Sequence, residues 1–258
     1  MDVAEAGSGT PLVLLHAFPL DSRMWDPLRA ELSPAVEVIA PDLRGFGRTP
    51  LPAEHGEPSM HAVADDVIAL MDERGLRRAV VGGCSMGGYV AMSVLRKAPH
   101  RVSGLLLIDT RPDADEAERR ANRLAAADRA ETDGTGWLAD TVLPGLLAAG
   151  TPDVSSELVA TVRSMITAQP SAGVAWAQRA MAARPDASDV LRSFDGPALV
   201  VVGERDVLSP PEQAREMAAL LPGGELVELP GCGHLSPLEA PAELATAITR
   251  WLVRANPR

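Results

Sequence analysis

The stretch VVGGCSMGGYVAM, residues 80–92, decides how the rest of the chain is interpreted. It places Ser85 among four glycines, directly after a short apolar run and directly before a helical pattern. Gly83, Ser85 and Gly87 form the pattern G-x-S-x-G, which is typical of a sharp strand-to-helix turn that exposes the serine hydroxyl. The glycines leave room for a tight backbone that side chains would obstruct. A glycine-rich turn with a serine is common by itself, so other residues have to decide its meaning.

Short apolar runs recur before and after this stretch. They are continuous rather than alternating, which is typical of strands covered on both faces. The predicted strands are residues 11–16, 36–42, 78–83, 104–110, 198–204 and 225–230. Helical patterns lie between or after them, at residues 59–75, 86–98 and 209–224 and in a last helix that aligns Leu244, Ile248, Trp251 and Leu252. This alternation predicts an α/β fold with a mostly parallel sheet covered by helices.

The predicted helix at 209–224 begins with an N-terminal capping signal. Ser209 and Glu212 have the spacing of a capping box, and Pro210 would occupy the first helical position.

Residues 112–195 interrupt the alternation. They are rich in alanine and charged residues, show helical stretches at 113–130, 155–169 and 172–184, and contain no convincing strand. Because binding crevices lie at the carboxyl ends of parallel strands, we expect this block to form a helical cap over that end of the sheet. Residues 1–111 and 196–258 would then form the core.

A serine hydroxyl is a weak nucleophile unless a base removes its proton. His234 is the candidate base, because it stands in a glycine-rich loop between the last predicted strand and the last helix. His55, His61 and His100 lie in polar or helical surroundings, where a solvated side chain is the better interpretation. His16 follows the first predicted strand, and we expect it to orient that loop through hydrogen bonds.

A catalytic histidine needs a carboxylate that fixes its tautomer and stabilises the imidazolium. Asp206 comes just after a buried strand, and the chain order Ser85, Asp206, His234 is the order that accompanies G-x-S-x-G. Asp109 also follows a strand and is the competing candidate. We favour Asp206, and we expect Asp109 to make local hydrogen bonds at the start of the cap.

Negative charge on a tetrahedral intermediate requires two backbone donors. The N–H of Met86, next after the serine, is one expected donor, and the N–H of Phe18 in the loop after the first predicted strand is the other. Pro19 has no N–H to donate.

Five segments resemble the marker segments of the α/β-hydrolase superfamily and occur in the same order. They are VLLHAFPLD, VIAPDLRGFGRT, GGCSMGGYVAM, VVVGERD and GCGHLSPLEAP. The resemblance implies a mostly parallel sheet of eight strands, with the first strands abbreviated or absent here because the segment before residue 10 is short. It also implies a catalytic triad of Ser85, His234 and Asp206, and a structural turn that contains Asp42, Arg44 and Gly45.

Serine at position 85 excludes branches that resemble haloalkane dehalogenases and epoxide hydrolases, in which aspartate occupies this place. The chain looks most similar to a subgroup of 3-oxoadipate enol-lactonases, small carboxylesterases and cofactor-free haloperoxidases. This implies hydrolysis of a small ester or lactone through an acyl-enzyme, without metal or cofactor. A lyase, C–C hydrolase, perhydrolase or haloperoxidase reaction stays open, as does a non-catalytic ligand-binding role.

Arg111 is a candidate substrate-binding residue at the junction of core and cap. If the substrate carries a carboxylate, as the resemblance to enol-lactonases suggests, its guanidinium could orient that group. The alternative is an arginine that pairs with Asp113 or Asp115.

Composition excludes several partners. The formal charge of -11, from 24 basic and 35 acidic residues, would repel nucleic acid and anionic membrane surfaces. We expect no secretory signal and no transmembrane segment, and therefore a cytoplasmic location. Cys84 and Cys232 lie beside candidate site residues, and we interpret both as small buried hydrophobes rather than redox groups.

Overall fold

The computed structural model describes residues 1–258 except 7–8, 33, 35, 55, 151–154 and 258. Its strands form one seven-stranded sheet in the order β1-β3-β2-β4-β5-β6-β7. Neighbouring strands are parallel, except that β1 runs antiparallel to β3. The strands are β1 (Val3–Ala6), β2 (Thr10–Leu15), β3 (Val36–Pro41), β4 (Ala79–Cys84), β5 (Val102–Ile108), β6 (Ala198–Gly203) and β7 (Gly224–Leu229).

All six predicted strands are present, each within two residues of the expected limits. In β4, β5 and β6 every residue is buried, which explains why these strands read as continuous apolar runs. The additional strand, β1, has four residues, too few for a sequence pattern. The described residues therefore form a sheet of seven strands, one fewer than the eight that the resemblance implies.

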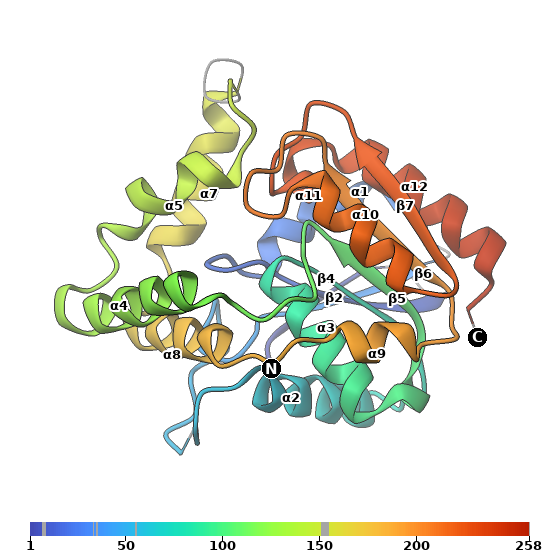
Figure 1. Ribbon diagram of the computed structural model, residues 1–258, viewed down its shortest axis with the longest axis horizontal. Helices are drawn as coiled ribbons and strands as arrows, with labels where there is room; N and C mark the ends of the chain where they lie inside the picture. Colours follow the sequence, from blue (N-terminus) through green and yellow to red (C-terminus); the bar gives the residue numbers. More distant parts are fainter. Residues whose placement is uncertain (7–8, 33, 35, 55, 151–154, 258) are drawn as a thin grey trace.

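Helices cover both faces of the sheet (Figure 1). They are α1 (Asp26–Glu31), α2 (Met60–Glu73), α3 (Met86–Lys97), α9 (Ser188–Arg192), α10 (Pro211–Leu220) and α12 (Pro241–Ala255). Helices α2, α3, α9 and α10 pack in succession over one face, and α1 packs with α12 on the other. Shorter helical turns are η1 (Ser22–Trp25), η2 (Pro99–Arg101) and α11 (Ser236–Glu239).

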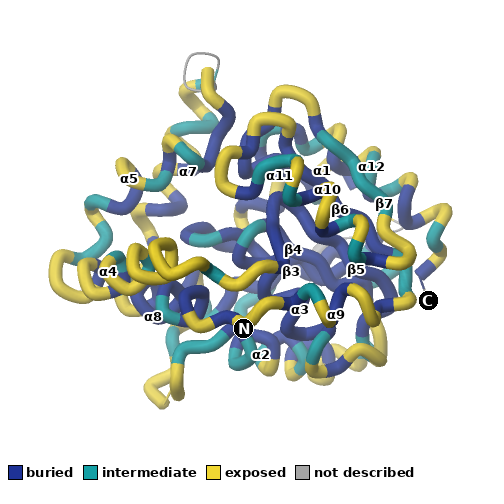
Figure 2. Tube along the Cα trace, in the orientation of Figure 1, coloured by how far each residue is buried: buried dark blue, intermediate teal, exposed yellow. Residues whose placement is uncertain are grey.

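Four helices of the segment 112–195 stand to one side of the layered core (Figure 1). They are α4 (Ala117–Asp133), α5 (Leu138–Leu146), α7 (Ser156–Thr167) and α8 (Ser171–Ala182). Helix α4 packs along α8, and α5 packs along α7. Much of the surface of α4 faces solvent, whereas the strands β4, β5 and β6 are buried (Figure 2).

The segment 112–195 contains no strand among its described residues, as predicted. Two of its helices, α5 and α9, were not predicted. Helix α5 contains Pro144, which masks its pattern, and α9 has only five residues. Because α9 packs against α3 and α10, the last part of the segment adds to the core layers. None of the helices formed by the described residues has the length and apolar content needed to span a bilayer.

The predicted start of the helix at 209–224 is wrong. Helix α10 begins at Pro211, and its N-cap is Pro210, which makes no side-chain cap bond. Ser209 lies in the preceding turn, where its N–H donates to Asp206 Oδ1 over 2.9 Å. The turn around the Asp206 carboxylate thus includes Ser209, and the helix starts one residue later than the capping box indicates.

Backbone atoms are packed unusually closely at the turn between β4 and α3. Ser85 has a φ of 52°, in the left-handed region that residues other than glycine rarely adopt. A Cβ on Gly83 would lie 2.3 Å from the carbonyl carbon of Gly87, and a Cβ on Gly87 would lie 2.0 Å from the carbonyl oxygen of Leu15. These two glycines therefore supply space, while the strained conformation belongs to Ser85 itself.

We predict that Gly87→Ala destabilises the protein on the order of 3 kcal/mol, because the added methyl group meets backbone that cannot move aside. Gly136→Ala is the matched control, since a Cβ there has no atom within 4 Å. Denaturant unfolding of both variants measures the difference. Equal unfolding free energies would show that the β4–α3 turn is less tightly packed than described.

Candidate active site

The predicted site residues follow the carboxyl ends of neighbouring parallel strands. Ser85 comes directly after β4, Asp109 directly after β5, Asp206 three residues after β6 and His234 five residues after β7. The register pairs Cys84 with Ile108 and Gly203 with Leu229, so these strands end side by side. The topology therefore brings residues up to 149 positions apart to one edge of the sheet.

Ser85, His234 and Asp206 form one continuous hydrogen-bonded chain. His234 Nε2 lies 2.8 Å from Ser85 Oγ, and His234 Nδ1 lies 2.7 Å from Asp206 Oδ2. His234 and Asp206 are each only 3% exposed, whereas Ser85 is partly accessible. A nucleophile, a base and an orienting carboxylate in this order are what serine-dependent acyl transfer requires.

The Asp206 carboxylate is held on its second oxygen as well. Asp206 Oδ1 accepts hydrogen bonds from the backbone N–H groups of Leu208, at 2.8 Å, and Ser209, at 2.9 Å. Burial alone would lower the pKa of His234, but the hydrogen bond and charge of Asp206, with the charge of Asp109, raise it above 6.5. The two carboxylates therefore stabilise the protonated imidazole, which is the form that His234 adopts after it accepts a proton.

Asp109 does not reach the imidazole and does not serve the cap in the way we expected. Its Oδ1 accepts from the N–H of Gly203 at 2.9 Å, and its Oδ2 accepts from the N–H and hydroxyl of Ser236 at 3.0 and 2.6 Å. Burial, then the nearby charge of Asp206, raises the pKa of Asp109 to about 7. Asp109 thus ties the end of β6 to the turn that follows His234.

A second carboxylate holds the histidine loop from the cap side. Glu239 accepts from the N–H of Gly233 at 2.7 Å through Oε2, and from the N–H of Ala148 at 2.8 Å through Oε1. Gly233 adjoins His234, and Ala148 follows α5. The loop is therefore fixed to the sheet by Asp109 and to the cap segment by Glu239.

The expected backbone donors, Phe18 and Met86, lie beside the serine. Met86 is the first residue of α3, whose opening N–H groups have no partner within the helix. Phe18 borders the same cavity as Ser85, and its peptide bond to Pro19 is cis. Among the described residues, neither N–H takes part in a hydrogen bond, so both are available to an incoming oxygen.

His16 orients the Phe18 loop, as predicted. Its ring is fully buried, Nδ1 donates to Ala17 O at 3.0 Å, and Nε2 accepts from Leu43 N–H at 3.0 Å. Because Nε2 accepts, the imidazole is neutral, in agreement with burial, which lowers the pKa of His16. The loop after β2 is thereby joined to the turn after β3.

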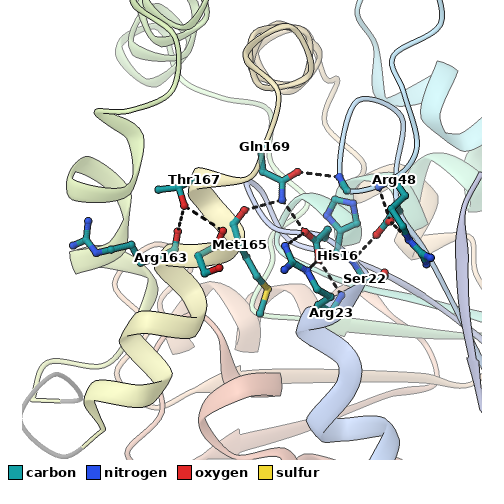
Figure 3. A network of polar contacts seen from close by, with 12 residues as sticks. His16, Ser22, Arg23, Arg48, Arg163, Met165, Thr167 and Gln169 are labelled. Atoms are coloured by element: carbon teal, nitrogen blue, oxygen red, sulfur yellow. Dashed lines mark hydrogen bonds and ion pairs between the residues drawn. The ribbon is translucent and has the colours of Figure 1, made fainter.

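A buried amide connects this loop to the cap (Figure 3). Gln169, at the end of α7, donates through Nε2 to Asp21 Oδ2 at 2.8 Å and accepts at Oε1 from the N–H of Gly47 at 2.9 Å. Asp21 also receives hydrogen bonds from Arg23. Gln169 is only 3% exposed, so a desolvated side chain joins the end of α7 to the loops that carry Asp21 and Gly47.

One cavity of about 320 Å³ contains Ser85 and His234. Its wall includes Phe18, Tyr89, Leu208 and Ser209, and the segment 112–195 contributes Arg119, Asn122, Arg123, Val142, Leu146, Gln178 and Met181. Apolar side chains thus border the serine together with a few polar groups, as in small-molecule sites. Sequence patterns could not assign these cap residues, because which side of a cap helix faces the core depends on packing.

Arg111 lies outside this cavity wall. It borders a neighbouring cavity with Arg119 and Asn122, and its Nη2 donates to Asp115 Oδ1 at 3.0 Å. Arg111 as a residue is 7% exposed, so it is a buried arginine paired with Asp115 rather than a solvated one. Arg111 therefore borders the neighbouring cavity and not the cavity that contains Ser85.

Neither cysteine contributes charge to the site. Burial raises the pKa of Cys84 well above its usual value and that of Cys232 to about 12, so both thiols stay protonated. His100 is exposed, as expected, whereas His61 is half-buried rather than solvated, and its pKa is lowered by burial. His55 lies outside the described residues. The described residues contain no group of three or more His, Cys, Asp or Glu that could hold a metal ion.

Comparison with known proteins gives likenesses over nearly the whole chain. The family model described as "Alpha/beta hydrolase family" matches residues 12–247. A pimeloyl-[acyl-carrier protein] methyl ester esterase of Nitrosospira multiformis is 28% identical over 260 residues, which cover 96% of this chain and 97% of that protein. A solved thermophilic esterase from Thermogutta terrifontis, malate bound, is 41% identical, with a TM-score of 0.94 and coverage of 98% of this chain and 93% of that one. The enol-lactonase from Burkholderia xenovorans LB400 is 28% identical, with a TM-score of 0.89 and coverage of 98% and 96%.

We predict that Gln169→Glu lowers the free energy of unfolding by about 2 kcal/mol at pH 8, because it replaces the donor to Asp21 by a second buried carboxylate while keeping the acceptor for Gly47. The new carboxyl has a folded pKa above its unfolded value near 4.3, so its destabilisation is full above the folded pKa and disappears as pH falls toward the unfolded pKa.

Denaturant unfolding of the Gln169→Glu protein at pH 8 and pH 5 measures this effect. Thr167→Glu adds the same charge at an exposed position of α7 and serves as the control, with a change within about 0.5 kcal/mol. A penalty that is the same at both pH values would contradict the contact with Asp21.

Proposed function

Since this chain belongs to the alpha/beta hydrolase family, we propose that it is a serine hydrolase that cleaves a small carboxylic ester or lactone through an acyl-enzyme. Ser85 is the proposed nucleophile, His234 the base and Asp206 the acid of the triad. One observation carries the proposal: an unbroken hydrogen-bonded chain runs from Asp206 through His234 to a serine that borders a cavity. The esterase and enol-lactonase relatives support the same reaction class.

In the proposed first step, His234 Nε2 takes the hydroxyl proton while Ser85 Oγ attacks the carbonyl carbon. The Asp206 carboxylate holds Nδ1–H, which leaves Nε2 as the proton acceptor and stabilises the imidazolium that forms. Because His234 is desolvated and already oriented, the proton transfer needs little rearrangement.

The tetrahedral intermediate carries its negative charge on the former carbonyl oxygen. We assign the N–H groups of Phe18 and Met86 to this oxygen, because both are near Ser85 and neither has another partner among the described residues. Collapse of the intermediate transfers the proton from His234 to the departing alkoxide oxygen. Water, deprotonated by His234, then attacks the acyl carbon. The bond from this carbon to Ser85 Oγ breaks, the acid is released, and His234 returns the proton to Ser85 Oγ.

We propose that the cap, residues 112–195, selects the substrate while the core, residues 1–111 and 196–258, supplies the chemistry. The support is the division of the cavity wall: the proposed catalytic groups come from the core, and most of the remaining wall comes from α4, α5 and α8. A volume of about 320 Å³ suits a small acyl group rather than a long lipid chain.

Ser85→Ala tests the proposal directly, because it removes the nucleophile from a turn whose shape the glycines maintain. We expect loss of hydrolysis of short-chain esters and loss of labelling by a fluorophosphonate, with unchanged unfolding free energy. Ser93→Ala, on the same helix but away from this cavity, is the control. Turnover near the wild-type rate in Ser85→Ala would refute the nucleophile, and ligand binding without labelling or turnover in the wild type would favour a binding protein.

A comparison of the two buried carboxylates tests the triad. Asp206→Asn is expected to lower kcat on the order of 10⁴-fold, about 5 kcal/mol of barrier, by favouring the wrong imidazole tautomer, as in serine proteases. Asp109→Asn is expected to cost far less, since Asp109 bonds to Gly203 and Ser236 rather than to the imidazole. The values of kcat for both variants are compared at one pH, after folding has been verified. If Asp109→Asn is nearly inactive and Asp206→Asn is active, Asp109 rather than Asp206 is the acid of the triad.

A further inference from the structure

The wall of the Ser85 cavity is basic, although the chain as a whole carries a formal charge of -11. Arg119 and Arg123, both on α4, border this cavity. No aspartate or glutamate does so among the residues that the structure describes. A substrate that enters the cavity therefore meets positive charge on the cap side.

Arg123 belongs to a buried cluster that also contains Arg111 and Arg184. All three guanidinium groups donate to Asp115, whose side chain is fully buried. Hydrogen bonds from Arg184 and Arg123 outweigh the effect of burial and lower the pKa of Asp115, so the carboxylate is ionised. These three arginines are thereby committed to a structural ion cluster beneath α4.

Arg119 differs from its three neighbours. It lies one helical turn before Arg123, and within the described part of the chain its guanidinium forms no hydrogen bond and no ion pair. It borders both the Ser85 cavity and the adjoining cavity, where Glu116 and Glu118 lie nearby without pairing to it. Partial burial, then the charge of Arg111, lowers the pKa of Arg119. Arg119 thus lies beside a cluster in which three guanidinium groups already share the Asp115 carboxylate.

The cavity also has an apolar part that a carbon chain would fill. Val142, Leu146, Met181 and Leu208 border it together with Phe18. A chain of a few carbons with an anionic end matches this combination of an apolar wall and one unpaired guanidinium, because the guanidinium fork binds planar carboxylates.

We infer that Arg119 is a specificity-determining residue that binds a carboxylate of the substrate, so that the ester hydrolysed at Ser85 carries a second, ionised carboxyl group. This inference rests on the proposed ester hydrolysis for its substrate class. Arg119, rather than Arg111, is the residue that meets the anion, since Arg111 lies outside the Ser85 cavity and is paired with Asp115.

Monomethyl glutarate and methyl valerate form a matched pair of substrates, equal in acyl chain length and different in the terminal carboxylate. We expect the wild type to favour monomethyl glutarate in kcat/KM at low ionic strength. Arg119→Gln should lower the ratio of kcat/KM for the charged ester to that for the neutral ester by about 10-fold or more, mainly through KM. Added salt should weaken the preference in the wild type, because Arg119 is open to solvent.

Arg120→Gln is the control, since Arg120 is the adjacent, exposed arginine of α4 and borders neither cavity. A second pair, 4-acetoxybutanoate and butyl acetate, places the carboxylate in the alcohol part and shows which side of the ester Arg119 contacts. The inference is overturned if Arg119→Gln lowers kcat/KM equally for charged and neutral members of both pairs, or if Arg120→Gln has the same effect.

Binding of glutarate, measured by calorimetry in the Ser85→Ala background, separates this inference from the proposed function. If Arg119→Gln abolishes glutarate affinity in this background, the anion site is supported even if the wild type turns over no ester. In that case only the proposed hydrolysis is refuted. Unchanged glutarate affinity in the double variant refutes the anion site while ester hydrolysis by the wild type still stands.

Discussion

The backbone at the Ser85 turn is packed so closely that only glycine can occupy the two positions on which it depends. Gly83 touches Gly87, Gly87 touches the end of β2, and the left-handed conformation is left to Ser85. This contact fixes three things at once: the distance between β4 and α3, the direction of the serine hydroxyl, and the approach of the loop that carries Phe18. The remaining site residues are arranged around a hydroxyl whose place is already determined.

Loops that approach this hydroxyl are held by buried polar side chains rather than by their own secondary structure. Asp109 and Glu239 fix the loop of His234 through backbone N–H groups, and Gln169 fixes the Phe18 loop through Asp21. Each of these contacts joins segments that are far apart in the chain. Because a buried polar group without a partner is costly, each contact also restrains the segments it joins.

Sequence patterns predicted the six longer strands, because buried parallel strands leave uninterrupted apolar runs, and they predicted that Ser85, Asp206 and His234 would meet, because all follow strand ends. They missed β1 and α9, which are too short for a period to show. The capping box at Ser209 was misleading because the Ser209 N–H donates to the Asp206 carboxylate, which makes Ser209 part of the turn before the helix.

The contacts of the cap were beyond sequence patterns. Arg111 and Arg119 have the same chemistry and are eight residues apart. Arg119 lies on α4 and borders the cavity, whereas Arg111 precedes α4 and does not, and this difference follows from how the segment packs. Gln169 gave no signal, since a glutamine near a helix end is usually solvated. Its importance comes from Asp21 and Gly47, which lie more than 100 residues away in the chain.

The cluster around Asp115 has a consequence for how this chain can diverge. Three arginines share one buried carboxylate and hold α4 in place, while a fourth, one turn away, is not required for that anchoring. Replacement of Arg119 therefore leaves this ion cluster intact, whereas replacement of Asp115 leaves three guanidinium groups without their shared carboxylate. The anchoring of α4 and the proposed binding of substrate by Arg119 thus depend on different side chains, so the preference for charged esters can change while the helix keeps its place.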